Sequence, residues 1–509
     1  MTPLPFQHLW GLCSSAAAQY GGRVAGQHGA RRITYAELFA CAGRFGAQLG
    51  SRGLGRGDFA VLMMENSLDY MVALFGVFAA GAVAVPINAD TPASELDTIL
   101  SDCAPKVLIT RERILARLEK KVEGPQVVVV ASPIEIDGAA FGGTGLEGPG
   151  LEPSAPAMVL YTSGTTGHPK GVVLTHGNLA ANTCSIVEYL GLTPDDSIVN
   201  VLPFSHSFGN SVLLTHLAVG GKVIIENRFA FPGQVVQEMQ SLRPTGFSGV
   251  PTTFYILIHK TNFLQQDWSF LRYISQAGGG MRQETVAQLR RSLPNTAIYI
   301  MYGQTEGSAR LSYVPPEMLE RKLGSVGIAI PGCELRVVDA VGQPVQGDEA
   351  GEIVARGANV MQGYLNDPES SAAALRGGWL HTGDMARVDE DGYLYITGRK
   401  SDFIKSAGYR IGPAEVEEVI AAGAPEVEDV AVFGVPDEVL GEAVAACICC
   451  PREKFDASRI RNICLASLPL WKAPKYVIHT LQIPRTASGK KQYFVLREQF
   501  RGLASGSLK

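Results

Sequence analysis

An uncharged apolar segment, Tyr70–Ile87, constrains the fold more than any other stretch of the chain. It reaches the length of about 18 residues at which such a run can cross a bilayer. However, Ser67 and Asp69 are typical of a helix start, and Gly81 followed by Ala82–Pro86 is typical of a helix end and a buried strand. A helix that leads directly into a strand is typical of an α/β core. The sequence therefore predicts a buried helix and strand here, and no transmembrane segment.

The composition is that of a globular protein with more than one domain. A chain of 509 residues exceeds one compact core, and its 46% apolar and 18% charged residues exclude general disorder. Lys and Arg number 44 against 49 Asp and Glu, which gives no basic footprint for nucleic acid. The nine cysteines are odd in number and scattered, and their one cluster, Cys447–Cys450, lies in a strand-like run; the N-terminus lacks a signal-peptide pattern. These features predict buried free thiols and a cytoplasmic protein.

Alternating helix and strand patterns predict the architecture. A helix is expected near Tyr35–Ser51, a strand at Phe59–Met64, and a further helix near Gly177, after a loop rich in Gly and Thr. Short strands and turns follow from about residue 335. We therefore expect an α/β fold with a large N-terminal domain, residues 1–400, of helix-covered sheets plus a β-rich subdomain. A small α+β C-terminal domain, residues 401–509, is expected to follow it.

The strongest chemical signal is the segment Tyr161–Gly171, which reads YTSGTTGHPKG. Its backbone N–H groups and short hydroxyls can wrap an anionic phosphate, and Lys170 adds a mobile positive charge. The spacing differs from that of the GxxxxGK[ST] loop, so ordinary P-loop chemistry is not predicted. A Ser/Thr/Gly linker is the alternative, but a linker does not require a Lys-Gly pair directly before the next element.

This segment resembles the phosphate-loop signature of the adenylate-forming superfamily, which contains acyl-CoA synthetases, aryl-CoA ligases, luciferases and peptide-synthetase adenylation domains. Four further motifs resemble those of the family and occur in its order: Tyr302–Glu306, Trp379–Asp384, Gly398–Arg399 and Pro484–Lys490. The resemblance covers nearly the whole chain. It implies an enzyme that joins a carboxylic acid to ATP as an acyl-adenylate, releases pyrophosphate and passes the acyl group to a thiol. Mg²⁺ and coenzyme A are implied as further requirements.

The resemblance also implies roles for individual residues. Tyr302 would stack on adenine, Glu306 would hold Mg²⁺, and Asp384 would grip both ribose hydroxyls. Arg399 would contact the ribose, and Lys490 would bridge the acyl carboxylate and the α-phosphate. The remaining nucleotide-binding positions implied are Thr162, Ser163, Gly164, Thr166, Gly167, Lys170, Gly279, Gly303, Gln304 and Thr305, and Thr165 would join Glu306 in catalysis and at the metal.

Each of the main residues has a simpler interpretation as well. Lys490 can be a solvated surface lysine, which is what we expect of its neighbour Lys491. Glu306 can be a carboxylate at a helix N-terminus, and Asp384 can be a turn residue after Gly383. The order of the motifs favours function, because attack of a carboxylate on a phosphate depends on positioning and charge neutralisation.

The expected acid pocket surrounds His206, which resembles the histidine that lines the acyl site in the family, although a lone histidine can be structural. Ser205 stands where peptide-synthetase domains usually have an aspartate, which argues against an α-amino acid. Small or apolar residues without obvious charge indicate an uncharged aliphatic or aromatic acid. They are Phe208, Ser211, Val212, Phe247, Gly249, Gly278, Gly279 and Gly280, of which Gly280 is expected at the substrate.

For thiol transfer, the resemblance implies that the C-terminal domain is mobile and exchanges Lys490 for a loop beginning at Lys405. Gly408 in this loop would form part of a pantetheine tunnel, where a side chain would block the thiol. The family hinge, two positions after the arginine, is usually Asp or Lys. Here that position is Ser401, with Asp402 next, so either residue can be the hinge.

Three alternative functions stay open at this point. The acyl group can be delivered to the phosphopantetheine of a carrier protein by the same chemistry. A luciferase-like monooxygenase would need a specialised pocket that the sequence does not identify. A non-catalytic ATP-binding scaffold would have no need of Lys490, Glu306 and Asp384 together.

Overall fold

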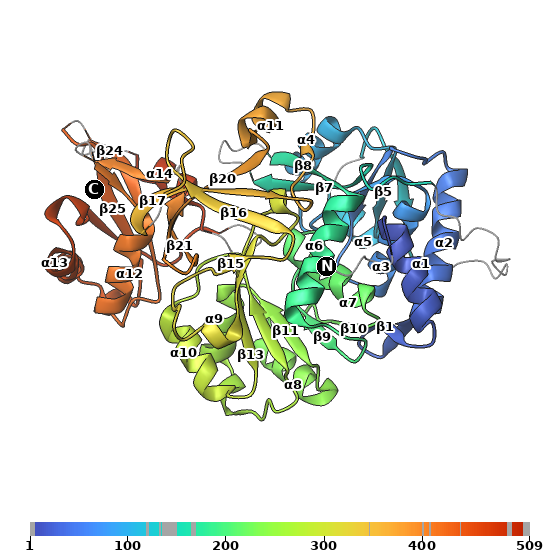
Figure 1. Ribbon diagram of the computed structural model, residues 1–509, viewed down its shortest axis with the longest axis horizontal. Helices are drawn as coiled ribbons and strands as arrows, with labels where there is room; N and C mark the ends of the chain where they lie inside the picture. Colours follow the sequence, from blue (N-terminus) through green and yellow to red (C-terminus); the bar gives the residue numbers. More distant parts are fainter. Residues whose placement is uncertain are drawn as a thin grey trace. The chain divides into compact units, whose positions relative to one another are not determined.

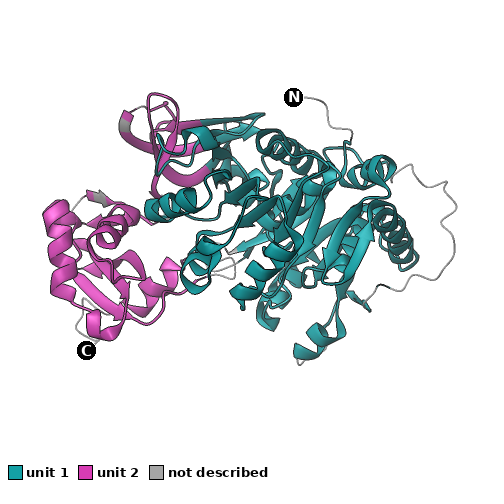
Figure 2. Ribbon diagram, turned by 90° about the horizontal axis from the view of Figure 1, so that it is seen from below, with its two compact units in different colours: residues 1–335, 355–381 teal, residues 336–354, 382–509 magenta. Residues whose placement is uncertain are grey.

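The computed structural model (Figure 1) describes residues 6–118, 122–131, 134, 150–163, 169–345, 347–399, 402–406, 409–437, 439–485 and 491–501. The chain divides into two compact units, shown in Figure 2. Unit 1 contains residues 1–335 and 355–381, and unit 2 contains residues 336–354 and 382–509. Unit 2 thus begins earlier in the chain than the C-terminal domain expected from residue 401, and that boundary stays a prediction.

One sheet of unit 1 has seven strands in the order β18-β8-β7-β4-β3-β5-β6. Strands β3 to β6 run parallel, whereas β7 and β8 form an antiparallel pair. The strands are β3 (Phe59–Met63), β4 (Val83–Ile87), β5 (Val107–Thr110), β6 (Gln126–Val129), β7 (Pro156–Ser163), β8 (Pro169–Thr175) and β18 (Gly363–Tyr364).

Strand β8 lies between the Gly/Thr-rich loop and the helix predicted near Gly177, whose start the structure confirms. The chain first forms β8, and α6 (His176–Leu190) begins only after Thr175, whose side chain caps the helix. Val172 and Leu174 are fully buried and lie opposite Leu160 and Met158 of β7. Alternate burial of this kind belongs to a strand, so the loop joins two antiparallel strands.

The second sheet of unit 1 has nine strands in the order β15-β14-β13-β12-β11-β9-β10-β1-β2. Its centre, from β13 to β1, is parallel, and its edge strands are antiparallel. The strands are β1 (Val24–His28), β2 (Arg31–Thr34), β9 (Ser197–Asn200), β10 (Lys222–Ile225), β11 (Gly246–Gly249), β12 (Tyr273–Gln276), β13 (Ala297–Tyr302), β14 (Ser312–Val314) and β15 (Ile328–Ala329).

Helices cover these sheets (Figure 1). The helices of unit 1 besides α6 are α1 (Leu9–Tyr20), α2 (Tyr35–Ser51), α3 (Leu68–Ala79), α4 (Ala93–Cys103), α5 (Glu112–Arg117), α7 (Ser207–Ala218), α8 (Pro232–Leu242), α9 (Pro251–Lys260), α10 (Gln283–Ser292) and α11 (Pro368–Ala374). The predicted helix near Tyr35–Ser51 is confirmed at both ends by α2.

The apolar segment Tyr70–Ile87 forms the predicted buried helix and strand, α3 and β4. Ser67 caps α3 by accepting a hydrogen bond from the backbone N–H of Tyr70. Helix α3 packs closely on α2, because a Cβ on Gly46 would lie 2.7 Å from the carbonyl oxygen of Gly76. Among the described residues, no helix combines the length and the apolar character that a membrane span requires.

Unit 2 contains a mixed sheet in the order β23-β22-β25-β24, with β26 beside β25. Its elements are β22 (Ile404–Ser406), β23 (Tyr409–Ile411), α12 (Pro413–Gly423), β24 (Asp429–Asp437), β25 (Gly441–Cys449), α13 (Ala457–Ser467), β26 (Tyr476–Thr480) and α14 (Tyr493–Gln499). All nine cysteines of the chain are free, and five of them are buried as predicted, whereas Cys41, Cys184, Cys333 and Cys449 are half-buried.

A further five-stranded sheet has the order β16-β17-β20-β19, with β21 paired to β20. Its strands are β16 (Cys333–Val338), β17 (Gly347–Gly357), β19 (Leu375–Arg376), β20 (Trp379–Val388) and β21 (Leu394–Arg399). This is the β-rich region that the sequence predicted after residue 335.

Candidate active site

Loops at the carboxyl ends of parallel strands carry most of the motif residues of unit 1. His206 follows β9, Gly279 follows β12, and Tyr302 is the last residue of β13. Because β9, β11, β12 and β13 are parallel neighbours, these loops lie at one edge of the sheet. Ligands of α/β proteins bind at this edge.

The segment after β13 folds into a tight turn that fixes Glu306. The N–H of Ala309 donates to the carbonyl of Gln304 at 3.3 Å. A Cβ on Gly303 would lie 2.1 Å from the carbonyl oxygen of Ala309 and 2.7 Å from the Cα of Arg310, so only glycine fits. The turn therefore presents Gln304 and Glu306 on a backbone that has little freedom.

Three polar groups of this motif differ in how they are satisfied. The ring of Tyr302 is buried at 7% exposure, and the hydroxyl of Thr305 donates to Ser207 at 3.4 Å. The side-chain nitrogen of Gln304 is buried and has no hydrogen-bond partner among the described residues. A buried donor without a partner is costly, so a ligand that accepts a hydrogen bond here would be favoured.

Tyr364 joins the glutamate of this motif to the lysine of the phosphate loop. Its hydroxyl donates to Oε1 of Glu306 at 2.9 Å, and Nζ of Lys170 lies 5.2 Å from the centre of its ring. Nζ of Lys170 also contacts Oγ of Ser370 at 2.5 Å and a carboxylate oxygen of Asp367 at 3.5 Å. Hydrogen bonds from Ser370, with Lys170 nearby, lower the pKa of the Asp367 carboxyl and keep it ionised. The pairing of β18 with β8 brings these groups together.

The phosphate loop is described only at its two ends. Thr162 lies on β7 and Lys170 on β8, directly opposite each other in the ladder. Tyr161 is held by a hydrogen bond of 2.6 Å from its hydroxyl to Asp102. The expected site residues Gly164, Thr165, Thr166 and Gly167 lie outside the described residues, as does the side chain of Ser163.

A narrow cavity lies between α6, α7 and the strands β11, β12 and β13. Its lining includes Ser211 and Val212, which the sequence placed in the acid pocket. His206 is the N-cap of α7, and the ring centre of Phe208 on the first turn lies 3.9 Å from the guanidinium carbon of Arg310. Arg310 also lines the cavity and brings a charge that the expected pocket residues lack. The tight turn after β13 carries this arginine inward, which sequence spacing alone did not reveal.

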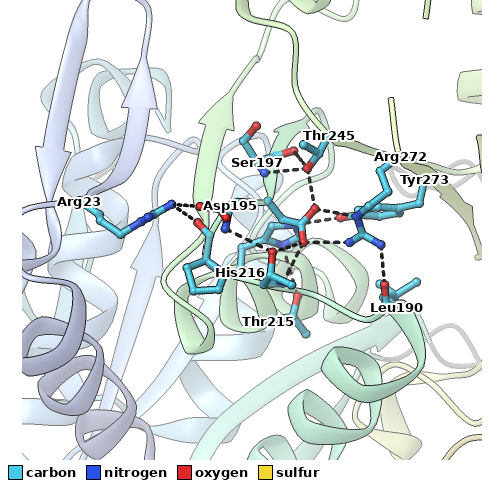
Figure 3. A network of polar contacts seen from close by, with 12 residues as sticks. Arg23, Leu190, Asp195, Ser197, Thr215, His216, Thr245, Arg272 and Tyr273 are labelled. Carbon is cyan, nitrogen blue, oxygen red and sulfur yellow. Dashed lines mark hydrogen bonds and ion pairs between the residues drawn. The ribbon is translucent and has the colours of Figure 1, made fainter. Parts of the chain in front are cut away.

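A polar network supports the floor of this cavity (Figure 3). The guanidinium of Arg272 donates two hydrogen bonds of 2.9 Å to the buried Asp196. Nδ1 of His216 lies 2.8 Å from the carbonyl of Val212, which can only accept, so Nε2 accepts from the hydroxyl of Tyr273 at 2.8 Å. Burial lowers the pKa of His216 to about 4, and the ring is therefore neutral at pH 7.

Gly279 and Gly280 are exposed in the loop after β12. The carbonyl of Gly279 accepts a hydrogen bond of 2.7 Å from the side chain of Gln276, which fixes the start of the loop. A Cβ on Gly280 would meet no atom within 4 Å, so packing does not explain this glycine.

In unit 2, Asp384 and Arg399 bind each other across the β20–β21 hairpin. They are register partners, and Nε of Arg399 donates to Asp384 at 3.0 Å. The Asp384 side chain is only 8% exposed, and its backbone N–H donates to the hydroxyl of Thr382 at 3.1 Å. The two residues that the sequence assigned to the ribose are thus brought together.

The other predicted residues of unit 2 are only partly described. Lys405 is exposed on β22, where its N–H donates to Glu442 at 2.6 Å, and the N–H of Asp402 donates to the carbonyl of Arg399 at 2.9 Å. Ser401, Gly408 and Lys490 lie outside the described residues.

Lys491 is not the solvated lysine that we expected. Its side chain is 19% exposed, and Nζ lies 2.7 Å from a carboxylate oxygen of Glu417. The hydroxyl of Tyr493 donates to the same carboxylate at 3.0 Å. Arg485, which pairs with Lys491 in an isolated β-bridge, is held by Asp429 at 2.5 Å. Both flanks of residues 486–490 are therefore anchored.

Sequence reasoning missed Tyr364 and Arg310 as site residues. Tyr364 lies in a two-residue strand whose pairing with β8 leaves no local pattern. Arg310 closely follows the Tyr302–Glu306 motif, and an arginine at that place is the sequence signal that could have identified it as a site residue.

Taken as a class, these features define an α/β enzyme that binds a nucleotide at strand ends, with a lysine and a glutamate beside one tyrosine. Residues 13–365 match the family described as AMP-binding enzyme, and residues 415–490 match the AMP-binding enzyme C-terminal domain. The chain belongs to this family, the adenylate-forming superfamily of AMP-forming acyl-CoA synthetases.

Similar proteins include several named CoA ligases. The chain is 33% identical over 482 residues to an indoleacetate–CoA ligase of Aromatoleum aromaticum, covering 92% of this chain and 93% of that protein. It is 31% identical over 545 residues to a long-chain-fatty-acid–CoA ligase of Escherichia coli, covering 99% of this chain and 96% of that protein. Among solved structures, the chain matches o-succinylbenzoate CoA synthetase of Bacillus subtilis in complex with its acyl-adenylate intermediate. The TM-score is 0.84 at 29% identity, and the match covers 97% of this chain and 98% of that one.

Proposed function

We propose that this acyl-CoA synthetase activates a fatty or aryl carboxylic acid and transfers it to coenzyme A in the cytoplasm. The observation that carries the proposal is the contact of Glu306 and Lys170 with Tyr364 at the strand ends. A phosphate-binding lysine and a hard carboxylate side by side suit a nucleotide triphosphate. The similar indoleacetate and long-chain-fatty-acid ligases support aryl and fatty acids equally.

In the first step, the acid's carboxylate oxygen attacks the α-phosphorus of ATP, and the bond from that phosphorus to the bridging oxygen of pyrophosphate breaks. Thr162, Lys170 and the residues between them would hold the phosphates through hydroxyl, backbone and ammonium donors. Gln304 would give its unpartnered N–H to the nucleotide, and Tyr302 and Gly303 would shape the adenine site. Gly279 and Thr305 would line this site.

The ribose would bind at Asp384, which Arg399 already orients. Lys490 would bridge the attacking carboxylate and the α-phosphate while charge moves from one to the other. His206 and Gly280 would border the acid, since both lie in the loops at the strand ends.

Magnesium fits this site through Glu306. One carboxylate oxygen accepts from Tyr364, and the other makes no hydrogen bond or ion pair with the described residues. The described residues contain no group of three or more His, Cys, Asp or Glu side chains that would form a metal cage. Mg²⁺ is usually held by one or two carboxylates together with phosphates, and when bound it neutralises phosphate charge. Thr165 would be the second protein ligand.

In the second step, the thiol sulfur attacks the acyl carbon, AMP leaves, and the thiol proton is lost to solvent. Lys405 and Gly408 would lie at the thiol, after movement about Ser401 or Asp402. We favour coenzyme A over a carrier protein as the acceptor, because the similar proteins bear the names of CoA ligases.

Two substitutions test these roles. Lys490→Ala should suppress acid-dependent pyrophosphate release while leaving thermal unfolding unchanged, because one loop lysine supports little packing. Gly408→Leu should spare acyl-adenylate formation and abolish the thioester. Near-normal pyrophosphate release in the first variant, or equal loss of both steps in the second, would contradict the assigned roles. ATP hydrolysis to ADP, or binding without acid-dependent AMP formation, would favour an ATPase or a non-catalytic scaffold.

A further inference from the structure

Arg310 is a buried cation without a counter-charge. The residue is 3% exposed, and no carboxylate of the described residues lies within ion-pair distance of it. Nη1 reaches only the carbonyl of Ala309, at 3.3 Å, and Nε has no hydrogen-bond partner among the described residues. Its other neighbours are neutral, namely the ring of Phe208 and the hydroxyl of Tyr189. A buried charge in such surroundings is costly unless something pairs with it.

Among the described residues, Arg310 is also the only charged side chain that lines the cavity beside α7. The cavity's one other titratable base, His216, is neutral because burial lowers its pKa to about 4. The carboxylate of Asp196 in the floor network already accepts two hydrogen bonds from Arg272. The cavity therefore has a net positive charge.

Hydroxyl groups face the same space. Ser248 and Ser275 lie on neighbouring strands with their oxygens 2.7 Å apart. Only one of these two hydroxyls can donate to the other, so the second keeps a hydrogen to donate. The hydroxyl of Ser211 is already used, because it donates to the carbonyl of Phe208 at 2.7 Å. An anion in the cavity would thus find guanidinium N–H groups and a serine O–H.

The cavity adjoins the adenylation motif directly. The Cα of Arg310 lies against Gly303, where an added Cβ would approach it to 2.7 Å. One tight turn therefore holds Glu306 on the nucleotide side and Arg310 on the cavity side. The cavity is narrow. Its volume is about 10 Å³, which is close to the space that one water molecule needs. This space leaves no room for a bulky ring beside Arg310.

We propose that Arg310 binds a second carboxylate of the acid, so that the preferred substrates of this enzyme are dicarboxylic acids. The inference rests on the proposed function. It replaces the sequence-based expectation of an uncharged acid with an acid whose far end is anionic. The carboxylate at one end is activated at the nucleotide, and the one at the other end pairs with the guanidinium.

The test compares each diacid with its own monomethyl ester, which keeps the chain and removes one charge. Malonate, succinate, glutarate, adipate and terephthalate form the panel, and acid-dependent pyrophosphate release gives kcat/KM for each. The variants are Arg310→Met, which keeps length without charge, and Arg310→Lys, which keeps the charge. Arg290→Met, an exposed arginine paired with Glu320 on the surface, is the matched control.

We expect the wild type and Arg290→Met to prefer a diacid over its half-ester by about 10- to 100-fold, the range for a hydrogen-bonded charge. Arg310→Met should lose or invert this preference, and Arg310→Lys should recover part of it. Equal use of diacid and half-ester by the wild type, or an unchanged preference in Arg310→Met, would overturn the proposal. The wild-type comparison stands even if Arg310→Met does not fold.

Binding separates this proposal from the proposed function. Calorimetry with adipate and its half-ester, without ATP, measures the same preference in the absence of turnover. Diacid binding by the wild type that Arg310→Met lacks supports the inference even if no acid is activated. Pyrophosphate release with monoacids alone upholds the ligase and overturns the inference.

Discussion

Removing one hydroxyl from Tyr364 isolates the contact that links Glu306 to Lys170 in the proposed nucleotide site. In Tyr364→Phe the ring stays, so the contact of 5.2 Å with Lys170 is preserved, while the hydrogen bond of 2.9 Å to Glu306 is lost. A hydrogen bond to a charged group contributes about 1.5–3 kcal/mol. Glu306 is half-buried, so we take the lower end. A loss of about 1.4 kcal/mol corresponds to about a tenfold change in rate.

The expected result is therefore a fall of about tenfold in kcat/KM for ATP, with a higher Mg²⁺ concentration needed for half-maximal rate. Pyrophosphate release at varied Mg²⁺ measures both. Tyr395→Phe is the matched control, because its hydroxyl donates to the carboxylate of Asp389 at 3.3 Å, in a hairpin turn that no nucleotide role is assigned to. If Tyr364→Phe matches the control in rate and in Mg²⁺ dependence, the assignment of Glu306 to the metal is refuted.

Two further predictions concern the supports of the site. Asp196→Asn should lower the free energy of unfolding by about 2–3 kcal/mol in urea titrations, because it breaks a buried ion pair whose Arg272 is partly exposed and can be resolvated. Burial raises the pKa of Asp196, but the hydrogen bonds from Arg272, Thr193 and Thr245 lower it further, for a net decrease. A carboxyl whose pKa is lowered in the folded state stabilises the fold at pH values above its unfolded pKa of about 3.9. The difference in free energy of unfolding between the wild type and Asp196→Asn should therefore be constant near neutrality and shrink as the pH falls below about 4. An advantage that grew on acidification would contradict this. Glu417→Gln should slow adenylation several-fold while sparing thioester formation from supplied acyl-adenylate, because Glu417 anchors Lys491, the sequence neighbour of the proposed adenylation lysine Lys490. Equal slowing of both steps would show that the anchor serves the whole unit instead.

Elements with strong local patterns could be predicted from the sequence, and elements defined by pairing could not. Helix α2 begins and ends where its apolar spacing and its Thr34–Glu37 capping box indicate. The segment that forms β8 could be interpreted as a strand or as a helix start, because a loop of Gly, Thr, His and Pro precedes it and a Lys-Gly pair lies near its start. Its identity depends on the ladder with β7, which is a tertiary contact.

The site shows the same division. The sequence proposed Lys170, Glu306, Asp384 and Arg399 because the chemistry restricts their types and spacing; the structure sets Glu306 and Lys170 against Tyr364 and pairs Asp384 with Arg399. Tyr364 was missed because it reaches Glu306 only through the pairing of β18 with β8. Lys491 was misjudged because neighbouring lysines look alike in sequence, whereas its partner Glu417 comes from α12.

The central claim is acid activation as an adenylate followed by transfer to coenzyme A. It is tested most directly by incubating the enzyme with ATP, Mg²⁺ and a panel of mono- and dicarboxylic acids, with and without coenzyme A. Pyrophosphate and acyl products are then followed, the latter by mass spectrometry. The account predicts pyrophosphate release that depends on the acid, acyl-adenylate without coenzyme A, and acyl-CoA with AMP when it is present. Pyrophosphate release that ignores the acid, or acyl-adenylate that persists when coenzyme A is added, would contradict it.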